Sequence, residues 1–173
     1  MITIISGTNR PHSNTFKLAT YYRQKLTERG VDSHILSLAD LSADFITADM
    51  YKSRSAAFQP YQDCITATEK FIFVIPEYNG SFPGILKTFV DACQFPNSFF
   101  NKKAALVGLS SGKYGNVRGV DHFTGVCHYV RLQVLPLRIH IPHIFQELND
   151  LGNLYREDTL RFTNEQIDEF IRF

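Results

Sequence analysis

Short apolar runs alternate along this chain with longer segments in which apolar residues recur every three or four positions. The run from Phe71 to Ile75 consists of β-branched and aromatic residues and is too short for a helix, so it predicts a strand buried on both faces. Behind it, Pro83 precedes an apolar stripe between Ile85 and Gln94, which predicts a helix. The intervening loop, Pro76 to Ser81, follows the carboxyl end of a strand, where open α/β sheets bind ligands.

The same two patterns predict the other elements. Strands are expected at Ile2–Ile5, Val31–Leu38, Ala104–Leu109 and Gln133–Leu137, and helices at Asn14–Arg29, Tyr61–Glu69 and around Val120–Val130. A last helix is predicted to begin at Thr163, which forms a capping box with Gln166. Residues 39–59 have weak periodicity and predict a loop or a partly mobile segment bordering the site.

Five repeats of strand and helix indicate an α/β fold, because right-handed crossovers place helices on both faces of a parallel sheet. We expect one domain, residues 1–173, built as a flavodoxin-like three-layer sandwich around a five-stranded sheet in the order 2-1-3-4-5. In that order the loops after strands 1, 3 and 4 open near the same switch point. These three polar loops are the candidate site.

Composition excludes several classes of function. The net charge is +1 and the sequence pI is about 7.8, so no overall field favours nucleic acid or an anionic membrane. No apolar run is long enough to cross a membrane, and the start MITIIS lacks the pattern of a secretory signal, so a cytoplasmic protein is expected. The cysteines, Cys64, Cys93 and Cys127, are widely spaced and are interpreted as small buried hydrophobic residues.

The remaining motifs give little support to other chemistry. His140 and His143 are the only close pair of histidines, with no cysteine or aspartate beside them, so no metal site is expected. No serine lies in a GxSxG sequence, which argues against a hydrolase.

The first loop offers a set of donors suited to a phosphate. It combines hydroxyls, amides and one arginine directly before a helix N-terminus, whose free N–H groups and dipole favour anions. The loop is neither a Walker A sequence nor a GxGxxG fingerprint, so it suits a monophosphate. An ordinary helix cap is the alternative interpretation. The donors are Ser6, Thr8, Asn9, Arg10, Ser13, Asn14 and Thr15.

Two motifs resemble those of the NADPH-dependent FMN reductases, a family of flavodoxin-like quinone, azo and chromate reductases. GTNRPHSNTFKLA is similar to the family's GSxRxxSxxxxLA, and PEYNGSFPGILKTFVDA is similar to PEYNGSxPGxLKxxxD almost residue for residue. FNKKAALVGLSSG and VLPLRIHIPHI extend the resemblance over nearly the whole chain. The resemblance implies an FMN-binding oxidoreductase that forms a homodimer or a homotetramer.

The resemblance also implies a set of site residues. The FMN phosphate would be bound by Ser6, Thr8, Arg10, Ser13, Asn14 and Thr15. The isoalloxazine ring and ribityl chain would be held by Pro76, Glu77, Tyr78, Asn79, Gly80 and Ser81, together with Ser110, Ser111 and Gly112. No catalytic side chain is expected, because hydride chemistry occurs at the flavin N5. Lys113 and Arg118 are candidates for the 2′-phosphate of NADPH, or else solvated surface charges.

The expected activity is hydride transfer from NADPH or NADH to bound FMN and then, by a ping-pong mechanism, to a quinone, azo compound, free flavin or similar acceptor. The rival hypothesis is a non-enzymatic electron carrier or a regulatory FMN-binding subunit. Carriers of this fold are typically strongly acidic, so the near-neutral charge favours the enzyme.

The sequence leaves open the acceptor, the donor preference, the oligomer size, and whether Phe95 to Phe100 lies in the core or at an interface. Lys87 and Asp91 are interpreted as helix-surface or dimer-contact residues.

Overall fold

A parallel sheet in the order β2-β1-β3-β4-β5 lies at the centre of the computed structural model, which describes residues 1–50, 54–149 and 151–173. This is the flavodoxin-like order, so the predicted fold class is confirmed. A sixth strand, β6, pairs with the upper part of β4, in register from Val107 opposite Ile139 to Leu109 opposite Ile141. The strands are β1 (Ile2–Ser6), β2 (Ser33–Ser37), β3 (Lys70–Pro76), β4 (Lys103–Leu109), β5 (Gln133–Val134) and β6 (Ile139–Ile141).

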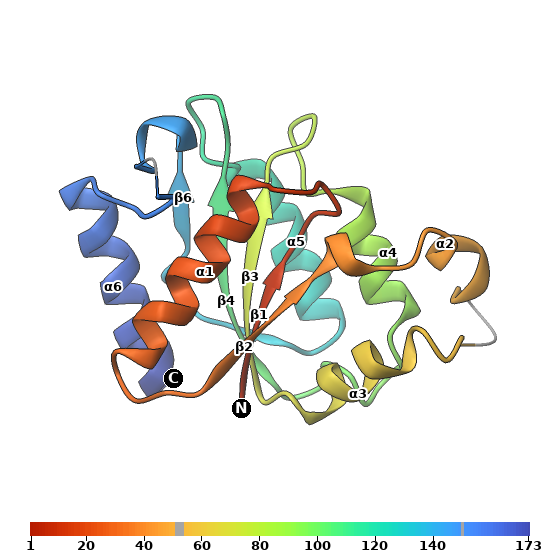
Figure 1. Cartoon of the computed structure of the whole chain (residues 1–173). Helices are drawn as coiled ribbons and strands as arrows, with labels where there is room; N and C mark the ends of the chain where they lie inside the picture. The colour runs from red at the N-terminus through yellow and green to blue at the C-terminus, as the bar shows by residue number, and fades with distance from the viewer. Residues whose placement is uncertain (51–53, 150) are drawn as a thin grey trace.

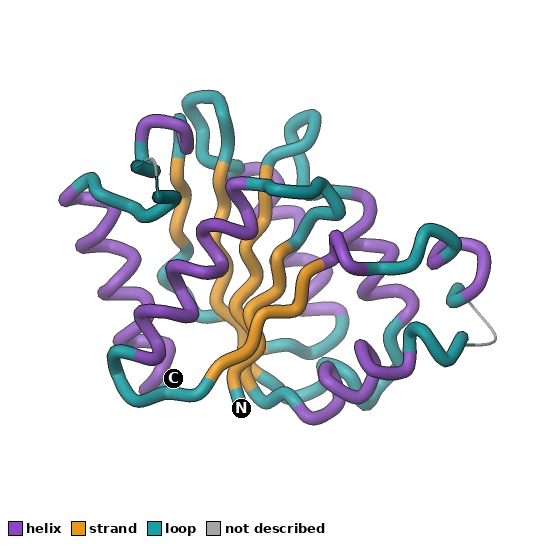
Figure 2. The backbone as a smooth tube through the Cα atoms, in the orientation of Figure 1, coloured by secondary structure: helices purple, strands orange, loops and turns teal. Residues whose placement is uncertain are grey.

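Helices cover both faces of the sheet, and Figure 1 shows α1 and α6 on the side opposite α3, α4 and α5. Figure 2 shows the strands as a twisted middle layer between these two groups of helices. The helices are α1 (Asn14–Thr27), α2 (Phe45–Ala48), α3 (Gln59–Ala67), α4 (Gly84–Ala92), α5 (Val117–Tyr129) and α6 (Glu157–Arg172), with short 3-10 turns η1 (Leu38–Asp40) and η2 (Ile144–Gln146).

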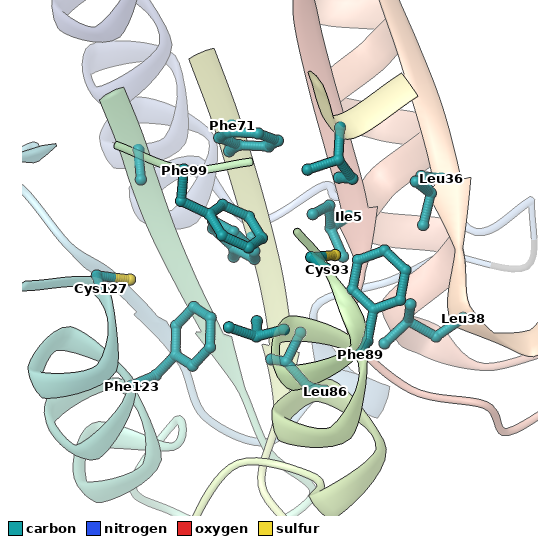
Figure 3. Packing of buried hydrophobic residues seen from close by; sticks show 14 of the residues in the cluster. Ile5, Leu36, Leu38, Phe71, Leu86, Phe89, Cys93, Phe99, Phe123 and Cys127 are labelled. Carbon is teal, nitrogen blue, oxygen red and sulfur yellow. The ribbon is translucent and has the colours of Figure 1, made fainter. Parts of the chain in front are cut away.

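The central strands β1, β3 and β4 are buried on both faces, and the two faces have different chemistry. Alternate residues of a strand point to opposite faces, so Ile72 packs towards α1 and α6 whereas Phe71 and Phe73 pack towards α3, α4 and α5. Phenylalanines dominate the second face: the ring of Phe73 lies 4.9 Å from that of Phe123, and the ring of Phe71 lies 5.5 Å from that of Phe99 (Figure 3). The first face is mainly aliphatic.

Two predicted elements differ from the structure in the middle and late parts of the chain. The fifth strand is not Gln133–Leu137 but the two-residue β5, and the chain pairs with the sheet again only at β6. Pro136 has no N–H to donate to the ladder, which suits the break between them. The predicted loop 39–59 contains η1 and α2, and its residues 51–53 lie outside the described part of the chain.

The last helix begins at Glu157, so the predicted start at Thr163 and its capping box are wrong. Thr163 is buried within α6, and its hydroxyl donates to the carbonyl of Thr159 at 2.7 Å. The Gln166 side chain donates to the carbonyl of Leu106 at 3.1 Å and accepts from the Tyr22 hydroxyl at 2.9 Å. Thr163 Oγ1 also lies 3.0 Å from the Tyr21 hydroxyl, so the two residues join α6 to α1 and the sheet instead of capping a helix.

The cysteines and the phenylalanine-rich connection each contain buried residues and more accessible ones. Cys93 and Cys127 are buried as predicted, and burial strongly raises the pKa of both thiols. Cys64 is only partly buried, with its Sγ 3.1 Å from His34 Nε2, so the prediction is wrong there. Phe99 belongs to the core, whereas Phe95 is exposed.

Among the described residues, no helix combines the length and the apolar character needed to span a bilayer.

Candidate functional site

The loops that follow β1, β3 and β4 lie at one end of the sheet (Figure 1) and line a groove of about 340 Å³. This is the meeting of loops expected from the strand order. Many of the predicted cofactor residues line the groove together: Thr8, Arg10, Ser13, Asn14, Thr15, Pro76, Glu77, Tyr78, Ser110 and Ser111.

The end of the groove at α1 is built to attract an anion. Ser13 is the N-cap, and its Oγ accepts from the N–H of Phe16 at 3.1 Å, so this oxygen does serve as a helix cap. The first N–H groups of the helix have no acceptor inside it, and the helix dipole is positive at this end. Arg10 and Lys17 also line the groove, and neither forms an ion pair with another described residue. The only carboxylate in the lining is Glu77.

The loop after β3 ends in a tight hairpin. The N–H of Tyr78 donates to the Ser81 carbonyl at 2.9 Å, and the N–H of Ser81 donates to the Tyr78 carbonyl at 3.0 Å. Asn79 and Gly80 between them have φ of 50° and 77°, the left-handed pair of a type I′ turn, for which Asn-Gly is the preferred sequence. Asn79, Gly80 and Ser81 are not in the groove lining, and Ser81 Oγ lies 3.0 Å from Nδ1 of His122.

Several contacts fix the three loops relative to one another. Thr8 Oγ1 lies 2.7 Å from the Tyr78 hydroxyl and joins the first two loops. Asn116, at the end of the third loop, donates from Nδ2 to the Ile75 carbonyl at 2.9 Å and from its backbone N–H to Glu77 Oε2 at 3.2 Å. The positioning role of Asn116 was missed from the sequence, because its partners lie about forty positions earlier in the chain.

Gly119 lets the first turn of α5 approach the hairpin closely. A Cβ at this position would lie 2.6 Å from the carbonyl carbon of Ser81 and 2.1 Å from Asn116 Oδ1. Such contacts are too short for carbon, so only glycine allows the hairpin and α5 to pack in this way. The first turn of α5 therefore packs directly against the backbone of the hairpin.

The loop after β4 is held by its own contacts and by the segment that begins at the end of β6. The N–H of Ser110 donates to the Ile141 carbonyl at 3.0 Å, and the N–H of His143 donates to the Gly112 carbonyl at 2.9 Å. Ser110 Oγ donates to the Gly112 carbonyl at 2.8 Å and accepts from the N–H of Gly115 at 2.9 Å. Gly112 is exposed and outside the groove lining. Lys113 lies with Nζ 5.0 Å from the ring centroid of Tyr114.

A second hollow lies beside the groove. Its volume is about 230 Å³, and it is lined by Glu77, Tyr114, Val117 and Arg118. Glu77 lines both spaces, so the hollow adjoins the groove. The predicted donor residue Arg118 is thus placed at the edge of the candidate site, whereas Lys113 lies outside both linings.

One predicted phosphate ligand, Ser6, lies outside the groove lining, and several residues that were not predicted lie in it. Ser6 is buried at the end of β1, outside the groove lining, and its Oγ has no hydrogen-bond partner among the described residues. Lys17 lies four residues after Ser13, a helical spacing that places both on one side of α1 and was a usable signal. The lining residues missed from the sequence are His12, Lys17, Leu109, Ile144 and Phe145.

The chain matches known proteins over most of its length. The sequence profile described as NADPH-dependent FMN reductase matches residues 1–146. A 2-hydroxy-1,4-benzoquinone reductase from a Burkholderia species is 26% identical over an alignment of length 147 that covers 78% of this chain and 80% of that protein. An NAD(P)H-dependent FMN reductase from Pseudomonas aeruginosa is 33% identical over 91 residues, 50% of this chain and 49% of that protein.

A solved structure has the same fold. It is the flavoenzyme NAD(P)H:(acceptor) oxidoreductase FerB from Paracoccus denitrificans, which superposes with a TM-score of 0.82 at 22% sequence identity. The match covers 99% of this chain and 94% of that one.

Proposed function

Since this chain belongs to the NADPH-dependent FMN reductase family, we propose that its groove binds FMN and that a quinone is the electron acceptor. The net reaction converts NADPH, a proton and a quinone into NADP⁺ and a hydroquinone, so two electrons pass from donor to acceptor. 2-Hydroxy-1,4-benzoquinone is one candidate acceptor, because a relative is named for its reduction. The observation that carries the proposal is the meeting of a cationic helix N-terminus and the loop after β3, through Pro76, Glu77 and Tyr78, in one groove.

The groove fits the two ends of FMN. Its α1 end has free N–H groups, Arg10 and Lys17 for a phosphate, and its lining also includes Tyr78, Leu109 and Phe145, which suit a flat ring. The unpartnered hydroxyl of the buried Ser6 lies at the start of the same loop. The proposed phosphate ligands are Ser6, Thr8, Arg10, Ser13, Asn14 and Thr15.

When bound, FMN supplies the hydride-accepting ring, and the protein supplies binding, orientation and electrostatics. The hairpin and the loop after β4 are proposed to orient the ring through Pro76, Glu77, Tyr78, Asn79, Gly80, Ser81, Ser110, Ser111 and Gly112. No side chain is assigned as a catalytic acid or base. Glu77 is better explained as a structural acceptor, because its carboxylate accepts from the N–H of Asn116.

Lys113 and Arg118 are the proposed contacts of the donor's 2′-phosphate. Both are exposed on the loop after β4 and the start of α5, and neither pairs with a carboxylate among the described residues. Two cations suit a dianion that NADH lacks. Substituting both by alanine should raise the KM for NADPH about tenfold while changing the KM for NADH little, and equal changes would remove these residues from donor recognition.

Donor and acceptor are proposed to use the same open groove in turn. Shared use predicts ping-pong kinetics, so initial rates at several fixed acceptor concentrations should give parallel double-reciprocal lines. Intersecting lines would require both molecules to bind together and would refute the shared space.

A second copy of the chain is proposed to cover the face formed by α4 and α5. This face has a hollow of about 480 Å³ bordered by Phe95 and Tyr129, whose exposed fractions are 69% and 79%. Large exposed aromatic side chains on one face are typical of an interface. Light scattering of the purified protein should give the mass of a dimer or tetramer, and Tyr129→Glu should lower it. A monomeric mass would contradict the proposal.

The decisive test is the visible spectrum of the FMN-reconstituted protein during anaerobic addition of NADPH. Oxidised flavin bands that bleach with NADPH, followed by their return when a quinone is added, would support the reductase. Bound flavin that NADPH does not bleach would favour an electron carrier, and absence of flavin binding would refute both.

A further inference from the structure

We infer that the hollow beside the groove is an acceptor subsite that selects planar aromatic quinones carrying a negative charge, such as the enolate of a 2-hydroxyquinone. The inference rests on the proposed reductase function and adds the class of its preferred acceptor. It is carried by Tyr114, Val117 and Arg118, which surround one side of the hollow.

The walls of the hollow suit a flat ring. Tyr114 is 58% exposed and Val117 is 41% exposed, so both side chains are accessible to a ligand in the hollow. The volume of about 230 Å³ is smaller than that of the groove and favours a compact acceptor over a whole dinucleotide. An aromatic ring presents a face on which a quinone ring can stack.

The charge of the hollow favours an anion. Arg118 forms no ion pair within the described ranges of the chain, and Lys113 adds a second positive charge next to Tyr114. The single carboxylate, Glu77, already accepts from the N–H of Asn116. A guanidinium can bind the two oxygen atoms of a hydroxyquinone enolate with parallel hydrogen bonds, which a neutral quinone cannot match.

The position of the hollow suits an acceptor. Because Glu77 lines both spaces, a ring in the hollow lies at the edge of the groove where electrons are delivered. The quinone would gain two electrons and one proton as a hydride that NADPH supplies beforehand and that bound FMN would hold, together with a second proton from solvent, and it would leave as the hydroquinone. In a ping-pong cycle the donor has left before the acceptor binds, so Arg118 is free to serve each in turn.

The test compares a matched pair of acceptors, 2-hydroxy-1,4-benzoquinone and its neutral methyl ether, 2-methoxy-1,4-benzoquinone. In ping-pong kinetics, kcat/KM for the acceptor reports only the oxidative half of the cycle, so a change in NADPH binding does not affect it. Arg118→Ala should lower the ratio of kcat/KM for the hydroxyquinone to that for the ether about tenfold, and Arg118→Lys should lower it less.

Two controls separate the pocket from a general effect of charge. Arg23→Ala removes the same charge from an exposed position on α1, across the sheet, and should leave the ratio unchanged. Calorimetric titration of the oxidised protein with the hydroxyquinone, without donor, should show about tenfold weaker binding for Arg118→Ala. This second readout does not depend on turnover.

The outcomes distinguish the inference from the proposed function. A ratio that falls in Arg118→Ala but not in Arg23→Ala supports the subsite. An unchanged ratio and unchanged binding in Arg118→Ala overturn the subsite, while continued reduction of the ether leaves the reductase intact. If the wild-type protein reduces neither quinone with NADPH, the reductase proposal fails and the subsite fails with it.

Discussion

Asn116 holds two loops of the candidate site together but does not line the groove. Substituting it should therefore lower the stability of the fold without removing a contact to a ligand in the groove. Asn116 is buried, adopts a left-handed conformation with φ 62° and ψ 35°, and donates its amide to the Ile75 carbonyl at 2.9 Å. Losing a buried hydrogen bond costs about 1 to 3 kcal/mol. The left-handed conformation costs a residue with a Cβ about 1 to 2 kcal/mol, and asparagine bears this cost better than alanine, so the alanine variant adds part of it. In the glycine variant the relief of this cost is offset by the greater entropy of the unfolded chain. Asn116→Ala should therefore lose about 2 to 4 kcal/mol, and Asn116→Gly about 1 to 3 kcal/mol.

Urea unfolding followed by circular dichroism measures these differences, because the free energy of unfolding falls linearly with denaturant. The expected order of stability is wild type, then Asn116→Gly, then Asn116→Ala. Equal stability of the two variants would show that the left-handed backbone is not strained. A wild-type stability in Asn116→Ala would show that the hydrogen bond from the Asn116 side chain to the Ile75 carbonyl contributes nothing.

Three further predictions concern the groove and its surroundings. Arg10→Ala should weaken FMN binding roughly 10- to 100-fold in a fluorescence titration, with Arg23→Ala as the charge-matched control, and unchanged affinity would remove Arg10 from the phosphate site. Thr8→Val and Tyr78→Phe each break the 2.7 Å contact between the first two loops, so their destabilisations of about 1 kcal/mol should be less than additive in the double variant, and full additivity would contradict the contact. Burial lowers the pKa of His140 in the folded protein, so the neutral imidazole contributes stability that is present above the unfolded pKa near 6.5 and is lost as the pH falls below that value towards the folded pKa. Between about pH 7.5 and 5.5 the wild type should lose more free energy of unfolding than His140→Gln, and equal losses in the two proteins would refute this prediction.

The sheet order and the location of the site were predictable, because they depend on local patterns. The buried run at Phe71 to Ile75 became β3, and the polar loop behind it became one wall of the groove. The crossover rules predict a parallel sheet with helices on both faces, and the flavodoxin-like order, one of two common orders for such a sheet, places the three polar loops together without knowledge of any side-chain contact.

The elements that failed depend on contacts between distant residues. Thr163 and Gln166 have the spacing of a capping box, but the same spacing recurs inside helices, and only burial against α1 and the sheet shows which applies. Ile144 and Phe145 reach the groove because β6 pairs with β4, and two-residue or three-residue strands carry too little pattern to reveal their partners. Asn116 was missed for the same reason.

The contrast between the two faces of the sheet makes each of them separately visible to nuclear magnetic resonance. Aromatic rings shift the resonances of methyl groups packed against them, so Ile5 and Leu86 on the phenylalanine-rich face (Figure 3) should resonate far from the usual methyl region. Methyl groups such as those of Ile4 and Leu18, on the aliphatic face, should stay close to it. A single methyl-labelled spectrum would then show whether a ligand in the groove perturbs the layer of α4 and α5, the layer of α1 and α6, or both.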